Sequence, residues 1–197
     1  EEEKKYENFS KSIRRRAATI GGHNMDDYPL KMSVFNRARL IKNSKNRIPY
    51  GVNLIQKHKR ESWIVFTENK KQANEFNKII NTKGFKSALY NTDLDSAERL
   101  ENLNRFKKAD LNVLVTCTAL DEGFDMPEAD GALILSASSS KRQRVQRMGR
   151  VLRITENKPN ALIVTVYSSK TEFDKLMEEA KRYHKEGVPV SWKRQDR

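Results

Sequence analysis

The feature that most constrains this chain is a regular alternation, from Glu61 onward, of short apolar runs with longer segments of helical periodicity. The runs WIVFT at 63–67 and NVLVTC at 112–117 are rich in β-branched residues, whereas the segments between such runs repeat apolar residues every three or four positions. Strands that alternate with helices predict parallel βαβ units. We therefore expect an α/β fold, with one parallel sheet flanked by helices on both faces.

The elements expected from this alternation divide the chain into three parts. The expected strands are 63–67, 86–90, 112–117, 131–136 and 161–167, and the expected helices are 69–83, 95–108, 140–148 and 171–186. Residues 1–58 differ, with one basic helix over 6–20 and a second over 31–43, bracketed by Pro29 and Pro49. We expect a mostly helical extension or connector at 1–58, an α/β domain at 59–186 and a basic tail at 187–197.

The charge of the chain is distributed unevenly. The 197 residues carry a formal net charge of +13. Residues 1–60 hold 15 basic and 6 acidic side chains, residues 61–135 hold 9 and 13, and residues 136–197 hold 15 and 7. Basic segments at both ends predict surfaces of positive potential that bind a polyanion, and nucleic acid is the partner they favour over a merely solvated lysine-rich surface.

Other classes of protein are excluded by composition. The longest apolar runs are far shorter than the roughly 18 residues of a membrane-spanning helix, so we expect no membrane partner. Cys117 is the only cysteine, which excludes an internal disulfide and a cysteine-built zinc site, and favours a cytoplasmic location. The three histidines are far apart in sequence, and we expect no metal site from them.

Polar side chains follow three of the expected strands. Ligands of open parallel sheets bind at the carboxyl ends of the strands, so these residues are candidates for phosphate contacts, although ordinary turns and helix caps use the same residue types. The candidates are Thr67, Asn69, Asn91, Thr92, Thr116 and Thr118. Three carboxylates after the third strand, Asp121, Glu122 and Asp125, leave open a Mg²⁺-dependent phosphoryl-transfer site.

The segment KRQRVQRMGRVLR at 141–153 holds six basic residues and no acidic one. Arg144, Arg147, Arg150 and Arg153 recur at three-residue spacing. Arginines presented in this way can offer planar donors to phosphoryl oxygens and stabilise charge that develops in phosphoryl transfer. The same pattern also suits a simple phosphate-backbone contact or a solvated basic face.

Three blocks in order resemble motifs IV, V and VI of the superfamily 2 helicases and translocases. The blocks are IVFTEN at 64–69, LVTCTALDEGFDMPEA at 114–129 and QRMGRVLR at 146–153. The segment at 93–107 resembles the stretch around a Glu-Arg pair and a following Phe in the same domain. Gln146 and the residues of the second block resemble the XPB-like and restriction-motor branch more than the DEAD-box proteins. Members of that branch mostly act on DNA.

This resemblance implies the second, C-terminal RecA-like domain of a two-domain motor driven by ATP with Mg²⁺. It implies that Arg150 and Arg153 are catalytic and reach the γ-phosphate, with Arg153 favoured as the arginine finger. It places Gln146, Gly123 and Asp125 beside the nucleotide. The six hydroxyl and amide residues after the strands, from Thr67 to Thr118, fall where such domains contact the nucleic-acid backbone, with DNA favoured over RNA.

The sequence contains neither a phosphate-binding loop of the GxxxxGK[ST] type nor a DExD or DExH box. Both belong to the first RecA-like domain of such motors, which would bind most of the Mg-ATP within the same polypeptide. We therefore expect this chain to be inactive alone. The alternative is a non-catalytic nucleic-acid-binding module on a RecA-like fold.

Overall fold

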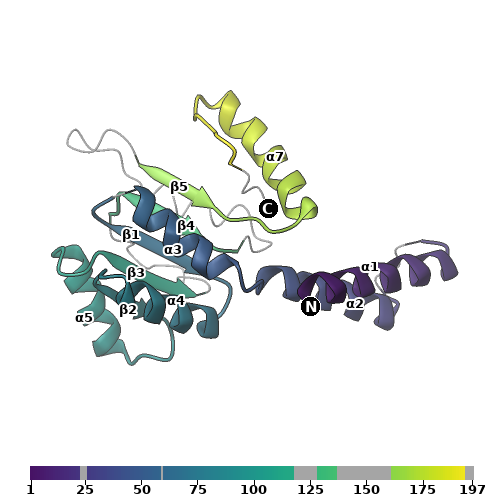
Figure 1. Cartoon of the computed structure of the whole chain (residues 1–197), viewed down its shortest axis with the longest axis horizontal. Coiled ribbons are helices and arrows are strands. Elements are labelled where there is room, and N and C mark those ends of the chain that lie inside the picture. The colour runs from purple at the N-terminus through teal and green to yellow at the C-terminus, as the bar shows by residue number, and fades with distance from the viewer. Residues whose placement is uncertain (23–25, 59, 118–127, 137–160, 194–197) are drawn as a thin grey trace. The chain divides into compact units, whose positions relative to one another are not determined.

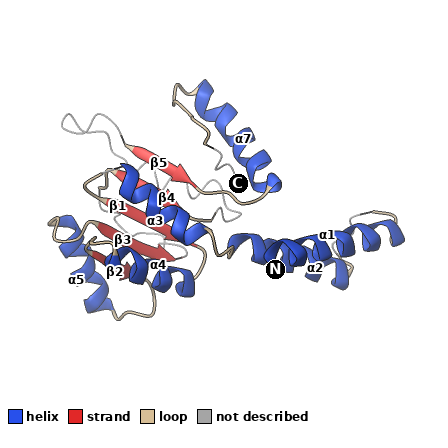
Figure 2. Ribbon diagram, in the orientation of Figure 1, coloured by secondary structure: helices blue, strands red, loops and turns tan. Residues whose placement is uncertain are grey.

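The computed structural model describes residues 1–22, 26–58, 60–117, 128–136 and 161–193 (Figure 1). The chain forms two compact units, Glu1–Val166 and Tyr167–Arg197. The first unit contains a sheet and the helices before and between its strands (Figure 2).

The first unit is built on five parallel strands in the order β2-β3-β1-β4-β5. The strands are β1 (Trp63–Thr67), β2 (Ser87–Tyr90), β3 (Val113–Cys117), β4 (Gly131–Ile134) and β5 (Leu162–Thr165). At the centre of the sheet, Val65 of β1 lies beside Val115 of β3 and Leu133 of β4. The predicted parallel sheet is confirmed, with each strand within two residues of its expected bounds.

Helices cover both faces of this sheet because successive side chains of a strand point to opposite faces. Trp63 and Val65 are buried in one core together with side chains of α3 (Arg47–His58) and α4 (Lys70–Thr82). Ile64 is buried in a second core, together with Leu103 and Phe106 of α5 (Ser96–Lys107). The predicted arrangement of helices on both faces is therefore confirmed.

Helix α3 was not expected from the sequence, since Pro49 reads there as a boundary. Pro49 lies in the first turn of α3, where a missing N–H costs nothing because the first four N–H groups of a helix have no partner within it. Ile48, Val52 and Ile55 of this helix are buried in the core on the α4 face. Residues 47–58 thus contribute directly to the core of the sheet.

The N-terminal residues form a hairpin of two antiparallel helices, α1 (Glu2–Thr19) and α2 (Tyr28–Lys42). At one end, the Glu2 carboxylate accepts hydrogen bonds from Ser44 Oγ and Lys45 N. At the other, Asp27 caps α2 by accepting from Leu30 N at 2.9 Å. Hydrogen bonds from Arg16, reinforced by that from Leu30 N, lower the pKa of Asp27. The predicted helical N-terminal segment is confirmed.

The second unit contains α7 (Lys170–Lys185), which Ser169 caps by accepting from Glu172 N at 3.2 Å. The rings of Tyr167, Phe173 and Trp192 lie 5.2–6.3 Å apart, centroid to centroid, so the segment after α7 is held by an aromatic cluster. Across all the described residues of both units, every helix is too short or too polar to span a bilayer.

Candidate nucleic-acid and nucleotide site

The carboxyl edge of the sheet brings together several of the predicted contact residues. Thr67 ends β1, and its hydroxyl donates to the carbonyl of Thr116 on the neighbouring strand β3 at 3.0 Å. Both side chains are buried. Thr116 also lies beside Tyr90, which ends β2. The strand register therefore places Thr67, Thr116 and Tyr90 together at the carboxyl ends of the adjacent strands β1, β3 and β2.

Asn69 has two structural partners at this edge. Its Oδ1 accepts from Gln72 N at 2.9 Å and so caps α4, and its Nδ2 donates to Asn43 Oδ1 at 2.5 Å. A carboxamide with both ends engaged is held in one orientation. A ligand at this edge would therefore meet an Asn69 side chain that is fixed before binding.

Asn91 lies after β2 and is buried. Its Oδ1 accepts from Asp93 N at 2.9 Å, whereas its Nδ2 has no hydrogen-bond partner among the described residues. An unpaired buried donor costs about 1–3 kcal/mol, so such a group marks a place where a ligand or a water accepts. The adjacent Thr92 is exposed, and Asp93 pairs with Lys70 at the start of α4.

The other predicted site residues lie outside the described residues. They are the arginines Arg150 and Arg153, the nucleotide-pocket candidates Gln146, Gly123 and Asp125, and the remaining contact candidate Thr118. Asp121 and Glu122 lie there too. Among the described ranges, no group of three or more His, Cys, Asp or Glu side chains is arranged to hold a metal ion.

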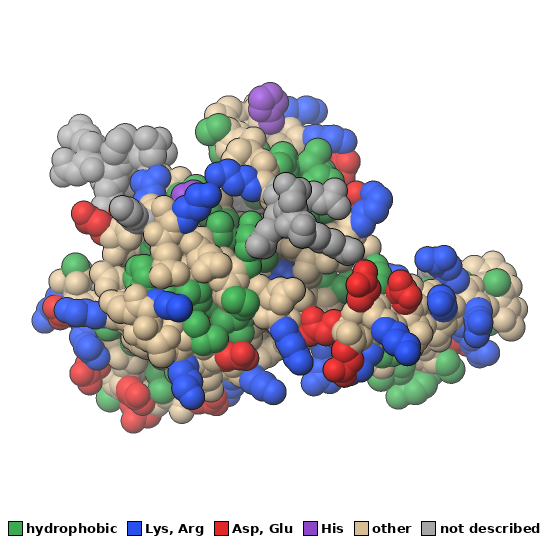
Figure 3. Space-filling model, viewed as in Figure 1, with side chains coloured by type: hydrophobic (Ala, Val, Ile, Leu, Met, Phe, Trp, Pro, Cys, Tyr) green, Lys and Arg blue, Asp and Glu red, His purple; other side chains and the backbone are tan. Residues whose placement is uncertain are grey.

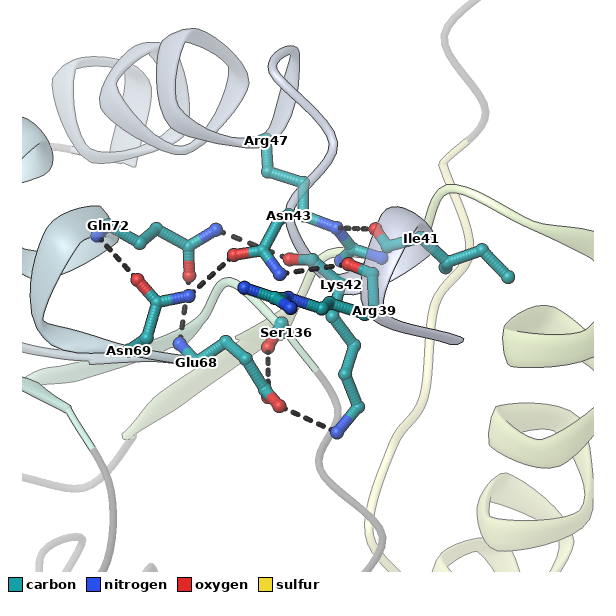
Figure 4. A network of polar contacts seen from close by, with 9 residues as sticks. All are labelled: Arg39, Ile41, Lys42, Asn43, Arg47, Glu68, Asn69, Gln72 and Ser136. Atoms are coloured by element: carbon teal, nitrogen blue, oxygen red, sulfur yellow. Dashed lines mark hydrogen bonds and ion pairs between the residues drawn. The ribbon is translucent and has the colours of Figure 1, made fainter. Parts of the chain in front are cut away.

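A polar network around Glu68 was missed by sequence reasoning (Figure 4). Glu68 Oε1 accepts from Lys42 Nζ at 2.6 Å, and Oε2 accepts from Ser136 Oγ at 2.9 Å. Gln72 accepts from Glu68 N at 2.8 Å. Glu68 thus joins the end of α2 to the residue two positions beyond β4. The partners are 26 and 68 positions away in sequence, and no local pattern signals such a pairing.

Arg47 is the second feature that the sequence did not reveal. It begins α3 and is 1% exposed. Its Nη1 donates to the carbonyls of Leu135 at 2.6 Å and Val166 at 2.8 Å, and its Nε donates to Ile41 O at 3.0 Å. A single guanidinium therefore fixes the chain leaving β4, the chain leaving β5 and the end of α2 relative to one another. Figure 4 shows its contact with Ile41.

The class of protein follows from the comparison of this chain with known families. Residues 46–155 match the helicase conserved C-terminal domain family, and the chain belongs to that family. The match begins just before α3, in agreement with the packing of that helix in the core of the sheet. It also includes the segment that carries Arg150 and Arg153.

Two known proteins of this class are similar to the chain over much of its length. The chain is 29% identical over 187 residues to the DNA 3'-5' translocase XPB2 of Sulfurisphaera tokodaii, covering 87% of this chain and 41% of that protein. It is 30% identical over 125 residues to the UvrABC system protein B of Fusobacterium nucleatum, covering 60% of this chain and 19% of that protein. The chain therefore spans less than half the length of either relative.

Solved structures support the same fold. The C-terminal domain of the DEAD-box protein Dbp5 superposes with a TM-score of 0.63 at 22% identity, covering 74% of this chain and 82% of that one. The helicase domain of Pyrococcus furiosus Hef gives a TM-score of 0.52 at 18% identity, covering 88% and 37%. The predicted RecA-like fold and the resemblance to superfamily 2 helicases are confirmed.

Proposed function

We propose that this chain is the second RecA-like half of an ATP-dependent superfamily 2 helicase or translocase. The observation that carries the proposal is the family match over 46–155, which includes both the carboxyl edge of the sheet and the arginine segment. In this proposal Thr67, Asn69, Asn91, Thr92, Thr116 and Thr118 contact the nucleic-acid backbone. The Nδ2 of Asn91 supports it, because this donor has no partner in the described part of the chain and a phosphate oxygen can accept from it.

The residues proposed for the nucleotide suit ATP in their chemistry. The guanidinium groups of Arg150 and Arg153 each offer several N–H donors to phosphoryl oxygens, and a carboxylate such as Asp125 can accept from a ribose hydroxyl. Gln146 and Gly123 complete this side of the nucleotide. Bound ATP supplies the γ-phosphoryl group whose transfer to water drives the motor, and Mg²⁺ is held mainly by the first RecA-like domain of the same polypeptide.

The role of the described residues in this mechanism is to hold the carboxyl edge rigid. Arg47 fixes the chain just after β4, and Ser136 is anchored by Glu68 at the point where the chain continues toward the arginine segment. Pre-organised donors stabilise developing charge better than mobile ones, because no free energy is spent on reorientation during the reaction. The network around Glu68 therefore fixes Ser136, the last described residue before the arginine segment.

DNA is the favoured substrate in this proposal, because the XPB2 relative is named as a DNA translocase. Other relatives are named as RNA helicases, among them the ATP-dependent rRNA helicase RRP3 of Scheffersomyces stipitis. The test is ATP turnover of the intact protein with single-stranded DNA and with RNA of the same sequence. Stronger stimulation by RNA would reverse the preference. A cytoplasmic location is also proposed, and the buried thiol of Cys117, the one cysteine of the sequence, is compatible with it.

The decisive experiment is Arg153→Ala in the intact protein. The expected loss of nucleic-acid-stimulated ATP turnover is about 10³–10⁵-fold, the range for arginine fingers, with nucleic-acid affinity unchanged. Arg105→Ala, which removes an exposed arginine of α5, is the matched control and should retain full turnover. A parent protein that binds nucleic acid without hydrolysing ATP would instead establish the non-catalytic binding module.

A further inference from the structure

Helix α2 carries a stripe of exposed aromatic and basic side chains. Tyr28, Met32 and Phe35 are 70%, 37% and 53% exposed, and they follow one another at intervals of four and three residues. At 100° per residue these positions share one face of the helix. Lys31 and Arg39, both exposed, lie on or beside the same face. We call these five residues the α2 stripe.

The α2 stripe faces away from α1. The opposite face of α2 makes the contacts within the hairpin: Leu30 is fully buried, Ser33 Oγ lies 3.3 Å from Ser12 Oγ, and Arg37 lies over the ring of Tyr6 at 5.9 Å from its centroid. The hairpin is therefore complete without the stripe. Its three large side chains keep 37–70% of their surface exposed to water, although burial of that apolar surface would be favourable.

The charge of α2 indicates what kind of partner could cover the stripe. The helix contains four basic residues, Lys31, Arg37, Arg39 and Lys42, and no acidic residue. Figure 3 shows many basic side chains over the hairpin, at the right-hand end of the view, with acidic side chains beside them and hydrophobic side chains along its lower edge. A surface that combines apolar rings with positive charge is complementary to a partner that has flat apolar groups on an anionic backbone.

The stripe leads to the carboxyl edge of the sheet. One turn beyond Arg39, Asn43 accepts from Asn69 Nδ2, and Lys42 pairs with Glu68. These contacts attach the end of α2 to Asn69, one of the proposed nucleic-acid contact residues. We call the row of these contact residues along the carboxyl edge of the sheet the nucleic-acid track. Tyr28 and Phe35 lie seven residues apart, about 10 Å along the helix axis, which extends the track away from the sheet.

We propose that the α2 stripe binds single-stranded nucleic acid, with Tyr28 and Phe35 stacking on bases and Lys31 and Arg39 contacting phosphates. This inference rests on the proposed function for its ligand and extends the site beyond the sheet. Stacking on exposed rings needs unpaired bases, because the bases of a duplex are already stacked on one another. A purely apolar protein partner would leave Lys31 and Arg39 desolvated and unpaired.

The test measures binding of a fluorescein-labelled oligodeoxythymidylate to the intact protein by fluorescence anisotropy. The double variant Tyr28→Leu with Phe35→Leu keeps the apolar surface but removes both rings. It should weaken binding about tenfold for each ring lost, whereas Phe35→Tyr should bind like the parent. Lys31→Gln and Arg39→Gln should each reduce the slope of log K against log salt by about 0.7.

Two matched controls lie on other helices. Leu100→Ala removes an exposed apolar side chain of α5, and Lys78→Gln removes an exposed lysine of α4. If the stripe variants bind the oligonucleotide as these controls do, the proposal is overturned. If they also change the mass in solution, measured by light scattering, the stripe is instead a contact between protein chains.

The outcome also separates this inference from the proposed function. ATP turnover stimulated by the oligonucleotide reports on the motor, and the affinity of the stripe variants reports on α2. If the stripe variants keep full stimulation of ATP turnover and unaltered affinity for the oligonucleotide, the proposed function stands and the proposed role of the α2 stripe is refuted. If the parent protein shows no ATP turnover but the stripe variants still lose affinity for the oligonucleotide, the proposed role of the α2 stripe stands and the proposed motor function is refuted.

Discussion

Replacing Arg47 with methionine should be among the most damaging single changes to this fold. Methionine approximates the length of the aliphatic part of arginine but donates no hydrogen bond. The carbonyls of Leu135 and Val166, which accept from the Arg47 guanidinium at 2.6 and 2.8 Å, would lose that donor. Both contacts are buried, so water cannot simply replace the guanidinium.

The magnitude follows from these contacts. A hydrogen bond to a charged group contributes about 1.5–3 kcal/mol net, so the two buried contacts together represent about 3–6 kcal/mol. Methionine recovers part of this, because it removes the cost of burying a charge. We expect the free energy of unfolding to fall by about 3 kcal/mol, which for a chain of this size lowers Tm by about 6–12 °C.

The assay is urea and thermal unfolding followed by circular dichroism. Arg105→Met, on the exposed surface of α5, is the control for the change in composition and should stay within about 0.5 kcal/mol of the parent. Arg47→Lys keeps the positive charge but lacks the planar guanidinium, so its free energy of unfolding should lie between those of Arg47→Met and Arg105→Met. An Arg47→Met variant as stable as the control would refute the reasoning about the buried carbonyls.

Two further predictions concern packing and pH. Gly131→Ala would place a Cβ 2.6 Å from the rigid, fully buried indole of Trp63, and we expect about 2–3 kcal/mol of destabilisation in urea unfolding. Gly51→Ala would place a Cβ 2.5 Å from a methyl group of Leu135, 3.1 Å from one of Leu133 and 3.3 Å from the ring of Phe76. The nearest atom is the end of a leucine side chain rather than a rigid ring, and alanine gains helix propensity, so this variant should cost less than Gly131→Ala; an equal or larger loss would contradict this. The pKa of Asp27 is held below its ordinary value of 3.8, so its stabilisation is complete above that value and is lost as pH falls through the lowered pKa. Asp27→Asn should therefore make unfolding less sensitive to acid than in the parent, whereas Asp110→Asn, at an exposed position, should not.

The sequence by itself determined the elements of the α/β unit and their class. Period-two and period-3.6 patterns are local properties of a strand and a helix, which is why β1 was predicted at its observed bounds and α4 within one residue of them. The order of the motif blocks likewise determined the family. Pro49 misled the prediction of α3, because a proline in the first turn of a helix and a proline that ends one are the same residue in a linear pattern.

Only the tertiary structure decided how the candidate site is held. Thr67, Asn69 and Asn91 were predicted as contact residues. The sequence could not show that Thr67 is engaged by Thr116, and Asn69 by Gln72 and Asn43. Nor could it show that Nδ2 of Asn91 has no partner among the residues the structure describes. Nor could it reveal the α2 stripe, since exposure depends on which face α1 covers. Hydrogen bonds across 26 to 119 positions, such as those of Glu68 and Arg47, arise from strand order and helix packing, which no local periodicity encodes.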